Sequence, residues 1–342
     1  MSSVVYLYDD VSRLRDGADE FFRIIAESFN GGVALKVHFG EKGNTTHVRP
    51  EWLKGAASIL DKPVFVDCNV LYRGGRTRMI DHLNVARQHG FGFLPLHILD
   101  GPVGEDTLEV PIVGGMLKTA KLGAGLGDYR QLVAVSHFKG HIATGFGGAL
   151  KNIGMGLGSR PGKLEMHSVI SPKVSSDKCV SCGTCVNECP GDAISLQGPA
   201  LIDSSKCIGC ARCIAVCPHA AIDIPWDLSD SVNKVLMERI AEYAQAALRG
   251  REWWFMSFIT DVTADCDCMP YAQKPIADDV GILLSKDPVA VDMASIDLVS
   301  RANGGVDPFL AKHGIDGRHM LDYAAEIGLG SQDYAVENVT NP

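Results

Sequence analysis

A repeated cysteine pattern constrains the fold of this chain more than any other feature of its sequence. The pattern CxxCxxCxxxCP occurs as CVSCGTCVNECP from Cys179 and again as CIGCARCIAVCP from Cys207, 28 residues later. The two copies also continue alike, because residues 193–194 and 221–222 both read Ala-Ile. This spacing lets three thiolates wrap around three irons of one cubane, while the fourth cysteine reaches another cluster. The repeat therefore predicts two [4Fe-4S] clusters in one small module.

The spacing also assigns each cysteine to a cluster. The first cluster is expected to take Cys179, Cys182, Cys185 and Cys217, and the second Cys207, Cys210, Cys213 and Cys189. A zinc site or a disulfide framework is the alternative, but zinc needs only two CxxC pairs, so the third CxxC step would be superfluous. Residues 171–226 resemble a bacterial two-cluster ferredoxin, and this resemblance implies one-electron transfer at low potential to or from a redox partner protein.

Strand-like and helix-like stretches alternate on both sides of this module. Short apolar strands are predicted at 4–8, 32–39, 63–67, 131–138, 253–261 and 280–284. Helices are predicted at 16–29, 50–60, 77–90, 228–250 and 287–302. This alternation indicates an α/β fold, a mostly parallel sheet with helices on both faces. We expect one α/β domain, residues 1–170 and 227–342, interrupted by an inserted α+β module at 171–226; three domains in series are the alternative.

The composition narrows the kind of partner that the chain can have. Its formal net charge is −9, so it has no bulk attraction for nucleic acid or for an anionic membrane. No apolar run approaches the ~20 residues that span a bilayer. The N-terminus shows no basic segment followed by an apolar one, so no secretory signal is expected and the chain is predicted to be cytoplasmic. In a reducing cytosol, its 11 cysteines are expected to be metal ligands or redox groups rather than disulfides.

Polar residues that follow the predicted strands are the candidates for a functional site, because ligands of such sheets bind at the carboxyl edge. The candidate catalytic residues are His38, Glu41, His47, His137, His141 and Lys151. The candidates for holding a cofactor are Lys139, Gly147, Gly148 and Asn152. Histidine serves as a base, a ligand or a hydrogen-bond partner. A structural role therefore stays open for each histidine.

The segment from Leu117 to Lys163 is basic although the whole chain is acidic. It contains seven basic residues and one acidic residue, Asp128, and eight glycines lie between Gly140 and Gly162. Glycines let backbone N–H groups approach an anion, and lysine adds charge. The segment therefore predicts a site for a phosphate or carboxylate group of a small anionic substrate or cofactor. The alternative is a flexible loop whose positive charges dock the acidic ferredoxin module.

Two further cysteines, Cys266 and Cys268, lie outside the repeat, in the sequence DVTADCDCMP. They follow a predicted strand, and residues two apart in extended chain point to the same side. Two thiolates on one side can chelate a soft metal or contribute ligands to a cluster. We therefore expect an additional metal, a cluster or a redox role at this pair, with Cys68 as a weaker candidate for a third ligand. In the alternative, the aspartates point inward and the thiols are incidental.

Several stretches together resemble one known family. KVHFGEKGN, DCNVLYRGGR, GGALKNIGMG, DVTADCDC and LLSKDPVAVDMASIDLV are similar to the uncharacterised Fe-S centre proteins built on domain of unknown function 362. This resemblance implies the same architecture, including the placement of the two-cluster module, and leaves the activity open. The stretch HIATGFGGALK also resembles a loop of the nickel-pincer lactate racemases.

Two functions are compatible with these features. In the first, the protein is a ferredoxin-linked oxidoreductase, whose module supplies electrons to a site at the sheet edge that holds an anionic substrate or cofactor. In the second, it is a non-enzymatic electron carrier or a metal- or cluster-delivery factor. Polar residues gather at several strand ends rather than on one helix face, and this distribution favours the enzyme.

Overall fold

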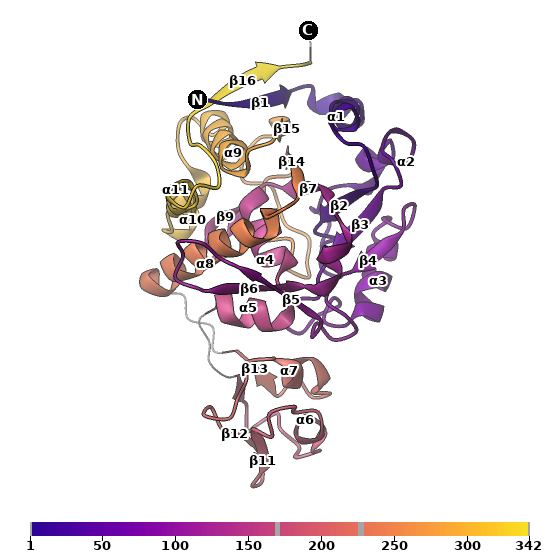
Figure 1. Cartoon of the computed structure of the whole chain (residues 1–342). Helices are drawn as coiled ribbons and strands as arrows, with labels where there is room; N and C mark the ends of the chain where they lie inside the picture. The colour runs from indigo at the N-terminus through magenta and orange to yellow at the C-terminus, as the bar shows by residue number, and fades with distance from the viewer. Residues whose placement is uncertain (1, 168–171, 225–228, 341–342) are drawn as a thin grey trace.

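The computed structural model describes residues 2–167, 172–224 and 229–340 (Figure 1). The predicted module boundaries at 171 and 226, and the predicted first residue of the helix at 228, lie outside the described residues. Figure 1 shows a larger α/β unit and a smaller cysteine-rich unit that extends from one end of it.

The larger unit is built on one eight-stranded sheet with the strand order β16-β1-β15-β14-β7-β2-β3-β4. All of its strands run in one direction except β15, which is antiparallel to both of its neighbours. The expected mostly parallel sheet is thereby confirmed. In chain order, the strands are β1 (Ser3–Tyr8), β2 (Val33–Val37), β3 (Val64–Asp67), β4 (Leu96–Ile98), β7 (Gln131–His137), β14 (Glu252–Ile259), β15 (Gly281–Ser285) and β16 (Tyr334–Asn338).

Helices cover both faces of this sheet. One face packs against α4 (Ala149–Leu157), α8 (Asp230–Leu248), α9 (Pro288–Ala302) and α11 (Arg318–Glu326). The other packs against α1 (Leu14–Ser28), the 3-10 helix η2 (Pro50–Leu53), α2 (Ala56–Ile59) and α3 (Met79–Gln88). The strand β7 explains why both faces are covered: Leu132 and Ala134 belong to the first core, Val133 and Val135 to the second, and all four are buried. A strand that is apolar on both sides needs a cover on both sides.

The remaining elements connect or border this frame. They are η1 (Val11–Arg13), η3 (Ala124–Asp128), the hairpin of β5 (Thr107–Pro111) and β6 (Thr119–Gly123), the hairpin of β8 (Lys139–His141) and β9 (Gly145–Gly147), α5 (Arg160–Met166) and α10 (Pro308–His313). The basic, glycine-rich segment thus forms strands and helices. The alternative of a flexible loop is wrong for it.

Two other details differ from expectation. The helix predicted at 50–60 is split into η2 and α2, and Gly55 lies between them. A Cβ at Gly55 would lie 1.8 Å from Asp19 Oδ1, so glycine permits the close approach of this segment to α1. The sheet also has two edge strands, β4 and β16, that were not predicted.

The cysteine-rich unit contains six short elements in its described residues. They are β10 (Lys173–Val174), α6 (Thr184–Asn187), β11 (Ile194–Leu196), β12 (Ala200–Ile202), α7 (Arg212–Val216) and β13 (Ile222–Asp223). β10 pairs with β13, and β11 pairs with β12. In Figure 1, α7 and β13 lie near the larger unit, and α6, β11 and β12 lie at the far end.

A search for membrane-spanning helices gives none among the described residues, since no helix there combines the required length with the required apolar character.

Candidate functional site

A cavity of about 880 Å³ lies at the carboxyl edge of the central strands. It is lined by residues at or just beyond the ends of β2, β3, β7 and β14, which are neighbours in the sheet. Helices α4, α5 and α8 contribute other walls, and Ser204 and Ile224 of the cysteine-rich unit complete it. The position agrees with the rule for open α/β sheets. The cavity is therefore shared between the two units.

The cavity wall carries an excess of positive charge. Among the described residues, its basic residues are Lys36, Arg76, Lys139, Lys151 and Lys163, and its single carboxylate is that of Asp67. Leucine, isoleucine, valine and methionine side chains supply much of the remaining wall. Such a wall favours an anion that also carries an apolar part.

Asp67 is fully engaged by cations of the protein. Its carboxylate lies 3.0 Å from Lys36 Nζ, 3.7 Å from Arg76 and 3.5 Å from His82, and it is almost completely buried. Burial opposes its ionisation, but Lys36, His82 and Arg76 outweigh that and hold the pKa of Asp67 well below its usual range. Lys36 also donates to Asn152 Oδ1 over 2.8 Å. Asp67 Oδ2 has ion-pair contacts with Arg76 and His82 but no hydrogen bond within the described residues, so opposite charges hold this floor of the cavity together.

Lys151 differs from the other cations of the wall. Lys139 donates to the carbonyl oxygen of His137 and lies 3.4 Å from Asp267, and Lys163 donates to the carbonyl oxygen of Gly158. Within the described residues, the Lys151 ammonium has no hydrogen-bond or ion-pair partner. Lys151 is therefore the cation that is free to bind an anion in the cavity.

The glycines at the start of α4 do not provide free amide groups. Asp292 accepts hydrogen bonds from the backbone N–H groups of Ala149 (2.6 Å) and Leu150 (2.9 Å). Gly148 permits this contact, since a Cβ there would lie 2.2 Å from Asp292 Oδ1. Gly147 and Gly148 line the cavity, but Asp292 already occupies the first N–H groups of the helix. An anion here depends on lysine side chains rather than on a backbone cradle.

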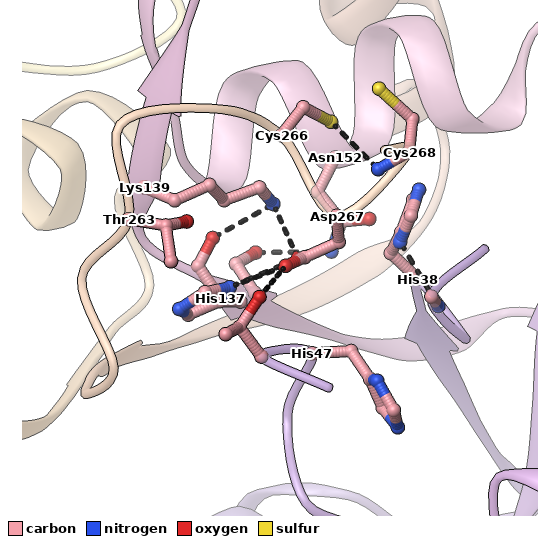
Figure 2. A network of polar contacts seen from close by, with 12 residues as sticks. His38, His47, His137, Lys139, Asn152, Thr263, Cys266, Asp267 and Cys268 are labelled. Atoms are coloured by element: carbon pink, nitrogen blue, oxygen red, sulfur yellow. Dashed lines mark hydrogen bonds and ion pairs between the residues drawn. The ribbon is translucent and has the colours of Figure 1, made fainter. Parts of the chain in front are cut away.

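Cys266 and Cys268 both line the cavity, as does Cys68. The loop is a tight turn, in which Met269 N donates to Cys266 O over 3.0 Å. Cys268 N also donates to Cys266 Sγ over 3.4 Å. Figure 2 shows the two cysteine side chains on one side of the loop and the Asp267 carboxylate on the other. The expectation for residues two apart is met at the cysteines, and the aspartate between them points into the protein.

The two thiols affect the ionisation of one another. Interaction with Cys268, helped by the charges of Lys151 and Lys139, lowers the pKa of Cys266 although burial opposes it. Interaction with Cys266 and burial raise the pKa of Cys268. Burial also raises the pKa of Cys68 well above its ordinary value. Of the three cysteines in the wall, Cys266 is therefore the one whose ionisation is favoured.

Asp267 fixes this loop from inside. Its carboxylate lies 2.9 Å from His137 Nδ1, and Thr46 Oγ1 donates to it over 3.3 Å (Figure 2). His137 Nε2 lies 2.8 Å from Thr260 O, so both ring nitrogens face acceptor oxygens. Burial opposes ionisation of Asp267, but His137 and Lys139 hold its pKa well below its usual range. His137 positions the cysteine loop and does not line the cavity.

The other candidate catalytic residues fall into two groups. His38 and His141 line the cavity, whereas Glu41 and His47 do not. Burial, assisted by nearby cations, lowers the pKa of both His38 and His141 well below the usual value. In each ring Nδ1 accepts a backbone N–H, from Gly40 and from Ala143 respectively. Both are therefore neutral imidazoles whose proton sits on Nε2.

Glu41 and His47 have structural roles. The Glu41 carboxylate accepts hydrogen bonds from Gly75 N (2.6 Å) and Tyr72 Oη (3.2 Å) and lies 3.4 Å from Arg76, which holds the loop after β3. His47 stacks on His89 with ring centroids 4.4 Å apart. Burial, followed by the His89 charge, lowers the pKa of His47 to about 4.

Lys163 and His167 are among the wall residues that were not predicted as site residues. Both belong to or follow α5, which the sequence did not indicate as a helix. Burial and then Lys151 lower the pKa of His167 to about 4. The excess of basic residues between 117 and 163 was the signal that could have pointed to Lys163.

The cysteine repeat is also a repeat of structure. Positive φ angles recur 28 residues apart at Ser181 (57°) and Gly209 (70°) and at Asp192 (47°) and Ala220 (50°). The fourth cysteine of each copy accepts a backbone hydrogen bond at its sulfur over 3.3 Å. The donors are Ala193 N for Cys189 and Ala221 N for Cys217. The two loops therefore have the same conformation.

The residues of one of the two sets that the spacing predicts lie around a common space. Cys179, Cys182, Cys185 and Cys217 line one small hollow. Burial raises the pKa of Cys213 to about 12, and the nearby charges of Cys210, Cys207, Cys185 and Cys189 add to this effect. Among the described residues, no three or more His, Cys, Asp and Glu side chains converge as they would around a single metal ion.

The second loop faces the larger unit. Leu71 and Leu164 pack into the core of the cysteine-rich unit. Arg73 donates to Cys217 O and, over 3.1 Å, to Pro218 O, and Arg78 donates to Ala215 O over 3.4 Å. The Cys213 side is thus close to the cavity, whereas Cys182, at the other end, is exposed.

Comparison with known proteins gives one family and remote structural neighbours. The model of domain of unknown function DUF362 matches residues 33–297. No curated protein matches the chain significantly. One solved structure, a lactate racemase apoprotein from Thermoanaerobacterium thermosaccharolyticum, is 13% identical with a TM-score of 0.37 and covers 75% of this chain and 50% of its own. Another, a protein from Thermotoga maritima, is 10% identical with a TM-score of 0.42 and covers 84% of this chain and 59% of its own. The chain thus spans about half to three fifths of their length.

Proposed function

The chain belongs to the DUF362 family, and we propose that this member is an iron–sulfur redox protein that transfers electrons to an anionic substrate or cofactor bound in the shared cavity. The observation that carries the proposal is the cavity itself. Ser204 and Ile224 of the cysteine-rich unit contribute to its wall, and the larger unit contributes Lys151 and the Cys266–Cys268 pair. A donor module and a reactive site would then border the same space.

The described cysteines fit two [4Fe-4S] clusters. The spacing divides them into two sets of four, and the set of Cys179, Cys182, Cys185 and Cys217 lines a hollow of its own. The amide hydrogen bonds to the sulfurs of Cys189 and Cys217 would stabilise the negative charge of bound thiolates. Such clusters supply one-electron transfer at low potential when they are bound.

The cavity residues would have separate roles. Lys151 would bind the anionic group, and Lys36, Asp67 and Asn152 would keep the floor of the site rigid. His38 and His141 carry a proton on Nε2 and line the cavity, so either could donate it to a reduced substrate. The leucine, valine and methionine side chains of the wall would exclude water from this transfer.

The two ends of the cysteine-rich unit would have different functions. The Cys207, Cys210, Cys213 and Cys189 set would serve the cavity, because its loop packs on the larger unit. The opposite end exposes Cys182 together with the apolar side chains of Val180 and Leu196, and we assign to it the contact with the redox partner protein.

A reoxidation experiment tests the proposal. The protein is purified without oxygen, reduced with dithionite, freed of excess reductant and mixed with a panel of small anionic acceptors. We expect absorbance near 400 nm to recover on addition of one class of acceptor, with about two electrons withdrawn per chain. Lys151→Met should slow this recovery, and Lys274→Met, an exposed cation on the cysteine loop that does not line the cavity, should not.

The same experiment separates the proposal from its alternative. A carrier or a metal- or cluster-delivery factor would be reoxidised by proteins and by no small acceptor, and its iron would move to a client. Reoxidation that depends equally on Lys151 and Lys274 would also contradict a role for the cavity.

A further inference from the structure

The Cys266–Cys268 turn offers a chemistry that a metal site would not use. Both cysteines line the cavity, and Cys268 N donates to Cys266 Sγ over 3.4 Å. Among the described residues, no third His, Cys, Asp or Glu joins them to complete a metal site. Cys68 lines the same cavity but directs its thiol to Leu157 O over 3.5 Å. The pair by itself supplies the two thiols that a redox dithiol needs.

The backbone is already shaped for a bond between the two sulfurs. A β-turn keeps its first and fourth Cα atoms within about 7 Å, and the hydrogen bond from Met269 N to Cys266 O defines such a turn. Cys266 and Cys268 are the first and third residues of this turn, and a disulfide needs Cα atoms about 4.4–6.8 Å apart. The turn therefore holds the two cysteines close together before any bond forms between them.

The turn is also held in place from three directions. Asp267 is completely buried and bonded to His137, Lys139 and Thr46. Its carbonyl oxygen accepts a hydrogen bond from Glu41 N over 2.9 Å. The anchor lies in the residue between the cysteines, so the turn can stay fixed while both thiols remain free to react.

We propose that Cys266 and Cys268 form a redox dithiol that exchanges with small anionic disulfides bound at Lys151. The Cys266 sulfur attacks one sulfur of the substrate, the substrate S–S bond breaks, and the first thiolate leaves. Cys268 loses its proton and attacks Cys266, an S–S bond forms within the turn, and the second thiolate leaves. Two electrons pass from the dithiol to the substrate, and the proton of Cys268 passes to a product thiolate.

The return step rests on the proposed function. Two electrons delivered singly through the cysteine-rich unit, together with one proton, would restore the dithiol. Lys151 would supply the preference for anions, because it is the cation of the described wall without a protein partner. The exchange itself needs no iron, so it can be tested apart from the clusters.

A peptide-mapping experiment measures directly whether Cys266 and Cys268 are reduced or joined by a disulfide. Cleavage after Arg251 and Lys286, with the Lys274–Pro275 bond resistant, releases a tryptic peptide, 252–286, that contains Cys266 and Cys268 and no other cysteine. The full-length protein is equilibrated with mixtures of reduced and oxidised glutathione, alkylated and digested. The mass of peptide 252–286 is then measured by mass spectrometry. We expect two alkyl groups under reducing conditions and none, with an internal disulfide, under oxidising conditions. Cys266→Ser and Cys268→Ser should each form a mixed disulfide with glutathione instead.

A rate comparison tests the role of Lys151. Disulfide formation in peptide 252–286 is timed with oxidised glutathione, which is anionic, and with cystamine, which is cationic. Lys151→Met should slow disulfide formation with oxidised glutathione by about tenfold. Its rate with cystamine should equal or exceed that of the wild type, and the final extent of disulfide formation should be unchanged. Lys274→Met should resemble the wild type with both reagents.

Two results would overturn this inference. One is a peptide that carries two alkyl groups under every glutathione mixture. The other is a pair that resists alkylation until a chelator is added, which would mark a metal site. If the protein purified without oxygen contained no iron but exchanged thiols normally, the proposed function would be refuted and the dithiol would stand.

Discussion

His137 Nδ1 and the Asp267 carboxylate lie 2.9 Å apart beneath the cysteine loop, and both side chains are buried. Asp267 follows the strand end of β14 and His137 ends β7, and these strands are neighbours in the sheet. The contact therefore ties the cysteine-bearing loop to the centre of the sheet. The cysteine pair owes its orientation toward the cavity to the aspartate between the two residues.

Replacing this aspartate should destabilise the protein. Asp267→Asn leaves His137 and Lys139 buried without their counter-charge, and breaking a buried pair in this way costs about 3–5 kcal/mol. Urea unfolding measures the loss. Asp265→Asn, on the same loop but only partly buried, should cost less than about 1 kcal/mol. Equal losses of unfolding free energy in the two variants would contradict an anchoring role for Asp267.

Stability should also fall in acid because of Asp67. Its pKa in the folded protein lies below the ordinary value of about 3.9, so its contribution is fully present above that pH and is lost as the pH falls further. Urea midpoints of the wild type and Asp67→Asn, taken in parallel from pH 6 to pH 3, test this. The variant should start lower and lose less below pH 4. Parallel curves would show that Asp67 does not contribute in this way.

Lys151 should control the binding of an amphiphilic anion. A hydrogen bond to a charged group is worth about 1.5–3 kcal/mol, so Lys151→Met should raise the dissociation constant of anilinonaphthalene sulfonate by about tenfold or more. Fluorescence titration of the full-length protein measures this change, and Lys274→Met is the matched control. An unchanged constant in Lys151→Met would place the anion elsewhere in the protein.

The two cysteine sets should be separable by substitution. Cys217→Ala should reduce the iron content from about eight atoms per chain to about four. It should also expose Cys179, Cys182 and Cys185 to alkylation, while Cys207, Cys210 and Cys213 stay protected. Cys189→Ala should give the reverse pattern, and Cys68→Ala should keep all of the iron. Exposure of the adjacent cysteines of the same copy would contradict the crossed assignment.

The sequence predicted the centre of the sheet better than its edges. The six expected strands are all present, because each is a short apolar run between turns. β4 has only three residues, and β16 reads Tyr-Ala-Val-Glu-Asn, most of it exposed, so neither has the pattern of a buried strand. Pairing with β3 and β1, rather than local preference, creates these edges.

The candidate site was predicted in position but not in detail. The carboxyl edge holds His38, His141, Lys139 and Lys151 around one cavity, as the strand ends suggested. The glycine-rich segment indicated a backbone cradle, and the structure gives its amide groups to Asp292, which lies more than 140 residues further along the chain. The spacing of apolar residues along a sequence cannot reveal a partner as distant as Asp292. It also cannot show that His141 lines the cavity whereas His137 does not.

Electron paramagnetic resonance of the anaerobically purified, dithionite-reduced protein, with iron and acid-labile sulfide measured on the same sample, tests the central claim most directly. The account predicts a brown protein with about eight irons and eight sulfides per chain, and a signal from two reduced [4Fe-4S] clusters. A colourless protein that contains zinc, shows no signal after reduction and holds no labile sulfide would contradict it.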